Sequence, residues 1–155
     1  DVGDRVRGPR GEDAGGDPRR FDYKGSMATI DYVDRRRMRL DVDFRFAASH
    51  RLPRYDGPCF RLHGHNYRFV VALEGDVEPR TGMIADFGEV KRIVGEIVLA
   101  RVDHRDLNDV LDNPTAENIA RWIWESLDGR LPGLAEVKLW EIPGCAVTYR
   151  GPGAR

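Results

Sequence analysis

Two stretches of the chain place apolar residues at every second position. Between Leu40 and Phe46 the apolar residues alternate with charged ones, and a second alternating set runs from Tyr67 to Leu73. Successive side chains of a strand point to opposite faces, so each stretch predicts a strand with one buried face. The loop between them is rich in proline and glycine, and we expect the strands to pair as an antiparallel hairpin that carries a long, functional loop.

Two later stretches carry apolar residues at helical spacing. Asp86 and Glu89 have the spacing of an N-cap and its capping-box partner, and an apolar stripe follows over residues 90–98. A second helix is predicted over residues 115–127, because Pro114 prevents an earlier start and Asp-Gly follows the last apolar position.

The chain ends in two further strand candidates, Val137 to Ile142 and Ala146 to Arg150, around a Pro-Gly-Cys turn. The element order is therefore β-β-α-α-β-β. Strands grouped at both ends predict an α+β domain, with a four-stranded antiparallel sheet that carries two helices on one face. Four strands do not close a barrel, so both sheet edges stay open, and we expect subunits to join there as a homo-oligomer.

Composition narrows the functional class. A chain of 155 residues suffices for one domain, and its net charge of −1 with 33% charged residues gives no basic surface for nucleic acid. The apolar runs are too short to span a bilayer, so no membrane association is expected. Two cysteines and no secretory signal indicate a reducing, cytoplasmic location.

The N-terminal region differs from the rest of the chain. Residues 1–26 contain no Ile, Leu, Met or Trp and are rich in Gly, Arg and Asp. Such a stretch buries too little apolar surface to offset its ordering entropy. We expect residues 1–38 to be a disordered extension and residues 39–151 to form a single catalytic domain. Gly25-Ser26-Met27 resembles a cloning junction; a natural mobile arm is the alternative.

Three of the four histidines occur where the predicted hairpin would bring them together. His63 and His65 are two residues apart, so both side chains point to one face of a strand. His50 is four residues after Phe46, so in a continuous strand both side chains point to the same face. His50 would then join His63 and His65 from the neighbouring strand. Three imidazoles with an open fourth position describe a catalytic zinc site, whereas structural sites are usually closed by thiolates. Ordinary polar histidines near a loop are the alternative.

Cys59 lies four residues before His63 and has two possible roles. As a fourth zinc ligand it would close the site and favour a structural role. As a free thiol with a pKa lowered by nearby cations it would be a base or nucleophile, which we favour.

Two further features suit proton transfer and ligand binding. The adjacent pair Asp103-His104 could act as a proton relay, although such pairs are common by chance. Glu141 shares the parity of Val137 and Leu139, so its carboxylate points where a strand normally buries apolar groups. A ligand with two parallel N–H donors would satisfy it, and an ion pair at the rim or an interface is the alternative.

Together these residues resemble one family, the 6-pyruvoyl-tetrahydropterin and 6-carboxy-tetrahydropterin synthases. The resemblance covers roughly residues 40–151 and rests on six motifs in register, so it is specific. In order they are Phe46-Ala47-Ala48-Ser49-His50, Cys59-x3-His63-Gly64-His65-Asn66-Tyr67, Gly82-Met83-Ile84-Ala85-Asp86-Phe87, Asp103-His104, Pro114-Thr115-Ala116-Glu117-Asn118 and Glu141.

The resemblance implies a tunnelling fold (T-fold), in which trimers close a barrel and pairs of trimers stack into hexamers. It implies Zn²⁺ on the three histidines His50, His63 and His65, with Cys59 as general base. It also implies that Asp103 and His104 are the proton-relay partners of that thiol.

The same resemblance implies the substrate contacts. Glu141 would anchor a pterin ring, whose edge presents two adjacent N–H donors. Thr115 and Glu117 match a motif near the pterin pocket, and Thr115 doubles as a helix cap. Ile142 follows Glu141 where the family commonly has threonine, which bears on hydrogen bonding around the anchor.

The short Cys-x3-His-Gly-His spacing is similar to that of the bacterial 6-carboxy-tetrahydropterin synthases of queuosine and other deazapurine pathways. The implied reaction, a carbon–oxygen lyase reaction, converts 7,8-dihydroneopterin triphosphate to 6-carboxy-5,6,7,8-tetrahydropterin, acetaldehyde and triphosphate. The alternatives are a 6-pyruvoyl-tetrahydropterin synthase, a non-catalytic pterin- or zinc-binding module, and a hydrolase with a thiol dyad of Cys59 and His104. The dyad would leave the other histidines unexplained.

Overall fold

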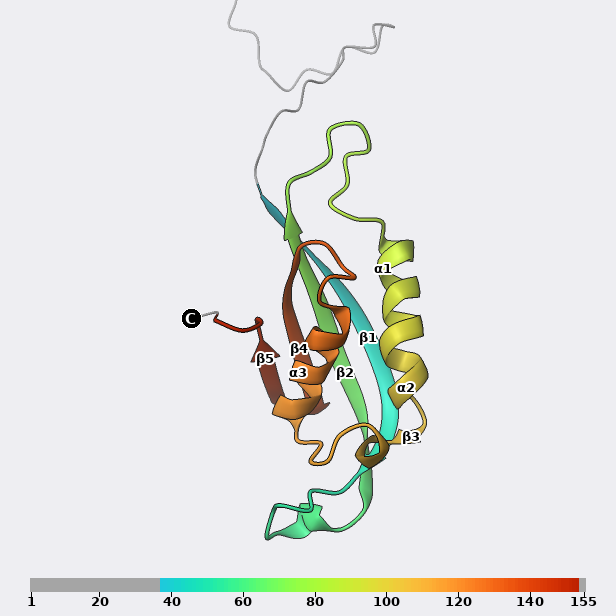
Figure 1. Ribbon diagram of the computed structural model, residues 1–155, viewed down its shortest axis with the longest axis vertical. Helices are drawn as coiled ribbons and strands as arrows, with labels where there is room; N and C mark the ends of the chain where they lie inside the picture. The colour runs from blue at the N-terminus through green and yellow to red at the C-terminus, as the bar shows by residue number, and fades with distance from the viewer. Residues whose placement is uncertain (1–36, 154–155) are drawn as a thin grey trace, which may run out of the picture. The chain divides into compact units, whose positions relative to one another are not determined.

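The computed structural model describes residues 37–153 (Figure 1). The N-terminal extension predicted over residues 1–38 lies outside the described residues, apart from its last two positions. Met38 is already the first residue of strand β1, which starts two residues before the predicted strand.

Four strands form the antiparallel part of the sheet. Strand β1 (Met38–His50) pairs along its whole length with β2 (His63–Gly75), so that His50 lies opposite His63. Strand β4 (Leu134–Ile142) pairs with the other edge of β2, and β5 (Cys145–Tyr149) pairs with β4. The strands predicted from alternation are all present, and most are longer than the pattern indicated.

A fifth strand corrects the predicted four-stranded antiparallel sheet. Strand β3 (Arg105–Asp106) runs parallel to β1 beside Ala48 and Ser49, which makes the sheet mixed, in the order β3-β1-β2-β4-β5. A strand of two residues has no alternation that a sequence pattern could reveal. It extends the edge of β1 at the end of the sheet that carries the histidines.

The first helical segment combines three pieces. Helix α1 (Phe87–Val94) continues through a π-helical turn (Gly95–Leu99) into the short α2 (Ala100–Val102). In an α-helix, residues four positions apart are offset around the helix axis by about 40°. The wider π turn offsets this rotation, so a stripe at four-residue spacing stays buried: Val90, Val94, Val98 and Val102.

Both predicted helix starts are confirmed, although the Glu89 carboxylate accepts from Arg92 and does not close the predicted capping box. The Asp86 carboxylate accepts a hydrogen bond from the Gly88 N–H at 2.7 Å, which caps α1. The Thr115 hydroxyl accepts from the Asn118 N–H at 3.3 Å and caps α3 (Ala116–Leu127). Single turns of 3-10 helix occur over Pro58–Phe60 in the loop after β1 and over Leu107–Asp109 after β3.

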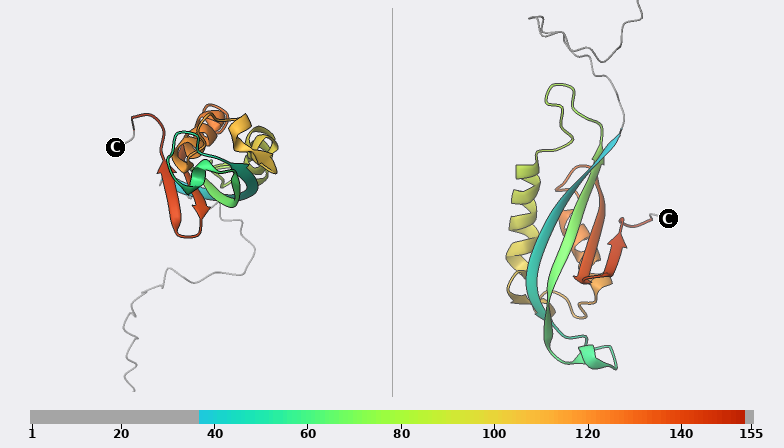
Figure 2. Two further views of the ribbon diagram at one scale, coloured as in Figure 1. Left: turned by 90° about the horizontal axis from the view of Figure 1, so that it is seen from below. Right: turned by 180° about the vertical axis from the view of Figure 1, so that it is seen from behind.

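The hydrophobic core lies between the sheet and the helices, which cover the same face in both views of Figure 2. Phe44 of β1 stacks on Phe69 of β2 with ring centroids 5.1 Å apart, and residues of α1 and α3 join the same cluster. The opposite face of the sheet carries charged side chains such as Asp43 and Arg68, which pair at 2.6 Å. Within residues 37–153, no helix combines the length and the apolar character needed to cross a bilayer.

Candidate metal centre and adjoining pocket

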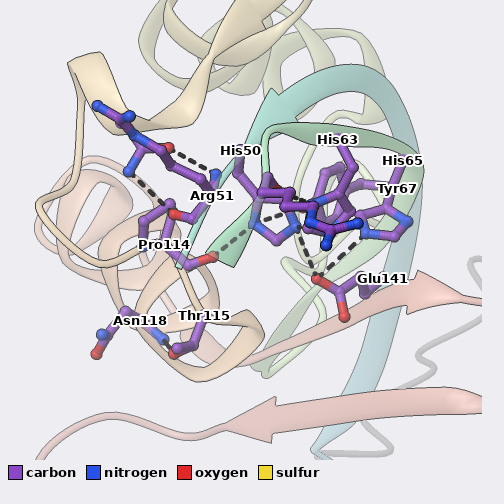
Figure 3. Close-up of polar contacts among 11 residues, drawn as sticks. His50, Arg51, His63, His65, Tyr67, Pro114, Thr115, Asn118 and Glu141 are labelled. Atoms are coloured by element: carbon purple, nitrogen blue, oxygen red, sulfur yellow. Dashed lines mark hydrogen bonds and ion pairs between the residues drawn. The ribbon is translucent and has the colours of Figure 1, made fainter. Parts of the chain in front are cut away.

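The β1–β2 hairpin determines where the three histidines lie. His50 is the last residue of β1 and lies opposite His63, the first residue of β2, while His65 lies opposite Ala48. The strand alternation that buries Phe46 and Tyr67 turns all three imidazoles toward the same face. Figure 3 shows the three rings converging from the two strands.

The nitrogens of these rings are close enough to share one ion. Nε2 of His50 lies 3.1 Å from Nε2 of His63, and one nitrogen from each of the three rings lies within 4.8 Å of the others. His50 is fully buried, whereas His63 and His65 are partly exposed. The group therefore faces solvent on one side, which a catalytic metal site requires.

Backbone carbonyls orient two of the rings. Nδ1 of His50 donates to the Pro114 carbonyl oxygen at 2.9 Å, and Nδ1 of His63 donates to the Arg61 carbonyl oxygen at 2.7 Å. A carbonyl oxygen only accepts hydrogen bonds, so each Nδ1 carries the proton. In the neutral ring, Nε2 is then the nitrogen with the free lone pair, and it faces the centre of the group, as in metal sites whose ligands are held by outer hydrogen bonds.

Burial keeps the third ring neutral. Desolvation lowers the pKa of His65 below its ordinary value of 6.5; the Glu141 carboxylate opposes that shift, and the neighbouring His50 and His63 add to it. Below these rings, burial raises the pKa of Tyr67, whose hydroxyl lies 3.3 Å from Nδ1 of His50. Three imidazole nitrogens from one hairpin fit a zinc ion.

Cys59 does not belong to the group of mutually close ligand atoms, which consists of the three histidines among the residues that the structure describes. It lies half-buried in the 3-10 turn of the loop, where its carbonyl oxygen accepts from the Leu52 N–H at 2.8 Å. This geometry gives no support to Cys59 as a fourth ligand, so its role as a free thiol stays a prediction.

Glu141 lies beside the histidines, on the face of β4 that sequence parity predicts. Its Oε1 is 3.4 Å from Nε2 of His50 and 3.8 Å from Nε2 of His65 (Figure 3). The side chain is 29% exposed, so the carboxylate borders the group of rings and also faces open space.

That open space is a cavity of about 480 Å³. It brings together the three residues that the sequence analysis assigned to substrate, Thr115, Glu117 and Glu141. The rest of the wall comes from the loop after β1, from the first residue of α3, and from the β4–β5 turn with β5: Leu52, Ala116, Gly144, Cys145, Ala146 and Val147. Ile142 does not line this cavity, because its side chain points to the other face of the sheet, where it lines a separate one.

Asp103 and His104 lie along the edge of β1 that faces β3, away from β2. The Asp103 carboxylate accepts from the Ala47 N–H at 3.0 Å and lies 3.0 Å from Nδ1 of His104. The bond from Ala47, with the contact to His104, holds the pKa of Asp103 below its ordinary value. His104 has a φ of 56° and is 81% exposed, so its ring points into solvent.

The structure does not bring this pair to Cys59. Asp103 and His104 line a cavity of about 780 Å³ over the uncovered sheet face, together with Arg45, Arg68 and Trp140. In the described part of the chain, Cys59 lines neither this cavity nor the one beside Glu141. The predicted site residues therefore form two groups within one chain.

Sequence reasoning missed the carbonyl of Pro114 and the hydroxyl of Tyr67. A backbone carbonyl leaves no signal in a sequence, because every residue has one. Tyr67 does have a signal, since it continues the parity of His63 and His65 into the buried face.

Comparisons with known proteins agree with this geometry. The sequence model of the 6-pyruvoyl tetrahydropterin synthase family matches residues 39–152. The chain is 38% identical to a Synechocystis protein named 6-carboxy-5,6,7,8-tetrahydropterin synthase, over 71% of this chain and 91% of that protein. It is 34% identical to human 6-pyruvoyl tetrahydrobiopterin synthase, over 75% of this chain and 94% of the human one.

A solved structure shows the same fold. The 6-pyruvoyl tetrahydropterin synthase of Caenorhabditis elegans superposes with a TM-score of 0.69 at 29% sequence identity, over 75% of this chain and 96% of that one. The expected α+β T-fold is thereby confirmed. The chain belongs to the 6-pyruvoyl tetrahydropterin synthase family of tetrahydropterin synthases.

Proposed function

We propose that the protein is a zinc-dependent 6-carboxy-5,6,7,8-tetrahydropterin synthase, a carbon–oxygen lyase of the cytoplasm. It would convert 7,8-dihydroneopterin triphosphate to 6-carboxytetrahydropterin, acetaldehyde and triphosphate, as a step toward queuosine or another deazapurine. The observation that carries the proposal is the convergence of three imidazole nitrogens beside a pocket whose wall contains a carboxylate. The name of the Synechocystis relative and the short Cys-x3-His-Gly-His spacing favour the carboxy-forming reaction.

The pocket supplies the recognition of a pterin. A carboxylate that faces two adjacent N–H donors makes a bidentate, charge-assisted pair, and Glu141 has the exposure and position for it. Thr115 and Glu117 line the same wall, next to the N-terminus of α3. What supports this assignment is the size of the cavity, about 480 Å³, which lies within the range of small-molecule sites.

The metal site adjoins the pocket on the side of Glu141. His50, His63 and His65 would hold zinc, which when bound lowers the pKa of hydroxyl groups on the substrate side chain. Pro114 and Arg61 keep the His50 and His63 rings in the ligand-competent tautomer. Cys59 would take and return protons along the substrate side chain as a general base.

The proton relay requires a second subunit in this proposal. Asp103 and His104 lie in the cavity over the uncovered sheet face, away from Cys59 of the same chain. The open edges of the sheet allow subunits to join, and a neighbour would then bring its own Asp103-His104 pair to this thiol. We therefore propose a trimer or hexamer in which each active site contains residues from two subunits.

Product identification tests the proposal. The zinc-loaded protein is incubated with 7,8-dihydroneopterin triphosphate, and acetaldehyde, triphosphate and the pterin product are measured. Release of both acetaldehyde and triphosphate with a 6-carboxy product is the expected result. An unchanged substrate would leave a non-catalytic pterin- or zinc-binding module as the better description.

A second candidate is the pyruvoyl-forming reaction. The likeness to the human synthase favours it, since the match covers 94% of that enzyme. This reaction releases triphosphate without acetaldehyde, so the same assay separates the two candidates.

A further inference from the structure

One oxygen of Glu141 lies close to nitrogens of two of the three histidines, His50 and His65, although Glu141 is outside the set of ligand atoms that all lie within 4.8 Å of one another. Oε1 is 3.4 Å from Nε2 of His50 and 3.8 Å from Nε2 of His65, whereas Nε2 of His50 and His63 are 3.1 Å apart. Atoms that bind one zinc ion tetrahedrally at about 2.0–2.1 Å are about 3.3–3.4 Å from each other. Oε1 therefore lies where a further ligand of an ion on His50 and His65 would lie.

No competing cation draws the carboxylate elsewhere. Within residues 37–153, Glu141 has no lysine or arginine partner, and its close polar contacts are with the two imidazoles. Other carboxylates of the sheet do have such partners, as Glu136 has in Arg39 at 2.7 Å. The carboxylate of Glu141 therefore has the histidines as its close polar neighbours.

The same carboxylate also belongs to the substrate pocket, with Thr115 and Glu117. Pairing with two N–H donors uses both carboxylate oxygens in one plane. Turning the carboxylate so that both oxygens face the two donors draws Oε1 from its place beside His50 and His65, so the two interactions compete.

We propose that Glu141 serves as an exchangeable fourth ligand of the metal centre. Without substrate, the carboxylate covers the open coordination position. When a pterin binds, its N–H groups would hydrogen-bond the Glu141 carboxylate and draw it from the ion. The coordination position left open would then be available to the substrate side chain. The pterin half of this proposal depends on the proposed function, whereas the metal half depends only on the three histidines and Glu141.

The consequence is negative linkage between metal and pterin. A ligand that removes Glu141 from the ion weakens metal binding, and by thermodynamic reciprocity the metal weakens the binding of that ligand by the same factor. A pterin without a side chain shows this effect cleanly, because it offers the N–H edge and nothing that replaces the carboxylate on the ion.

Cobalt(II) in place of zinc gives a readout that needs no turnover. Its visible absorption reports the coordination of the ion, and its affinity is measured by competition with a chelator. Glu141→Gln is expected to change the spectrum and to raise the Kd for cobalt about tenfold, as the loss of a supporting group does in other metal sites. Glu117→Gln, which alters a carboxylate of the same pocket away from the rings, is the matched control and is expected to leave both unchanged. The metal half is overturned if Glu141→Gln has the wild-type spectrum, or if both variants change it equally.

Unsubstituted pterin tests the exchange. Added to the cobalt-loaded wild-type protein, it is expected to raise the Kd for cobalt about tenfold and to shift the spectrum toward that of Glu141→Gln. In Glu141→Gln the same probe is expected to have no effect on cobalt affinity. An unchanged or tighter cobalt affinity in the wild type overturns the exchange. Failure of the proposed function would look different. The protein would leave dihydroneopterin triphosphate unchanged, while Glu141→Gln would still change the cobalt spectrum.

Discussion

His50, a proposed metal ligand, connects two parts of the candidate site. Its Nε2 faces the other histidines, while its Nδ1 donates to the carbonyl of Pro114 at 2.9 Å. Pro114 immediately precedes Thr115, which caps α3 and lines the pocket beside Glu141. The segment that orients the His50 ring is thus the segment that shapes the wall of the cavity, so a shift in one displaces the other.

Cys59→Ala separates the two roles of the thiol. Because Cys59 lies outside the mutually close ligand atoms, the variant is expected to keep zinc at about one ion per subunit while turnover is abolished. Metal content by elemental analysis and product formation are measured on the same preparation. Cys59→Ala that loses its zinc would instead identify the thiol as a ligand.

The sequence could predict that the three histidine side chains lie together, but not which backbone carbonyls orient their rings. The spacing of His63 and His65, with the parity of His50, sufficed to place three rings on one face. The carbonyl of Pro114 comes from a distant loop that folds against the hairpin, and only the tertiary structure brings it there.

Among the elements, β1, β4 and the residue after β5 are joined by one buried carboxylate. Glu136 of β4 is 5% exposed and pairs with Arg39 of β1 at 2.7 Å and with Arg150 at 2.9 Å. Arg39, with a smaller contribution from Arg150, lowers the pKa of Glu136 below its ordinary value of 4.5. This cluster lies on the uncovered face of the sheet, where apolar packing contributes little.

Acid titration of stability tests the cluster. Since the pKa of Glu136 is depressed in the folded state, its stabilisation is present above the ordinary value of 4.5 and is lost as the pH falls through the folded pKa. Glu136→Gln is expected to lower the free energy of unfolding at pH 7 by about 1–3 kcal/mol and to flatten its decline below pH 4.5. Urea unfolding between pH 7 and pH 3 measures both; parallel curves for the two proteins would rule out this role.

A glycine holds the entry into β4 against the end of β2. Gly133 has a φ of +79°, and a Cβ there would lie 2.5 Å from the Glu74 carbonyl oxygen. Gly133→Ala is expected to cost about 2–3 kcal/mol in unfolding free energy, because it combines backbone strain with a backbone clash. Gly129→Ala is the matched control, with a φ of +72° in open space, and is expected to cost about 1 kcal/mol. Equal losses in urea unfolding would mean that the clash is relieved without cost.

The sequence predicted every helix and strand whose apolar residues recur at a regular spacing. The alternation in β1 and β2 and the apolar stripe of α3 correspond to faces that are buried in the structure. Strand β3 and the π-helical turn at Gly95–Leu99 have no periodic signature of their own, and packing against β1 and the core determines them.

For the whole molecule, the separation of Cys59 from Asp103 and His104 is the feature that most strongly implies assembly. Complementation tests it. Cys59→Ala and His104→Ala are each expected to be inactive alone, since each lacks one half of every site. Co-expressed in equal amounts, they are expected to recover about a quarter of the wild-type activity if a site draws its halves at random from two subunits. Co-expressed variants that form mixed oligomers without activity would place both halves in one chain.

The proposed function depends on the candidate metal centre, and the metal content of the purified protein tests that centre. After equilibration with zinc and removal of the excess, elemental analysis is expected to find about one zinc ion per subunit in the wild type. A folded wild-type protein that retains no zinc would contradict the assignment of His50, His63 and His65 as its ligands.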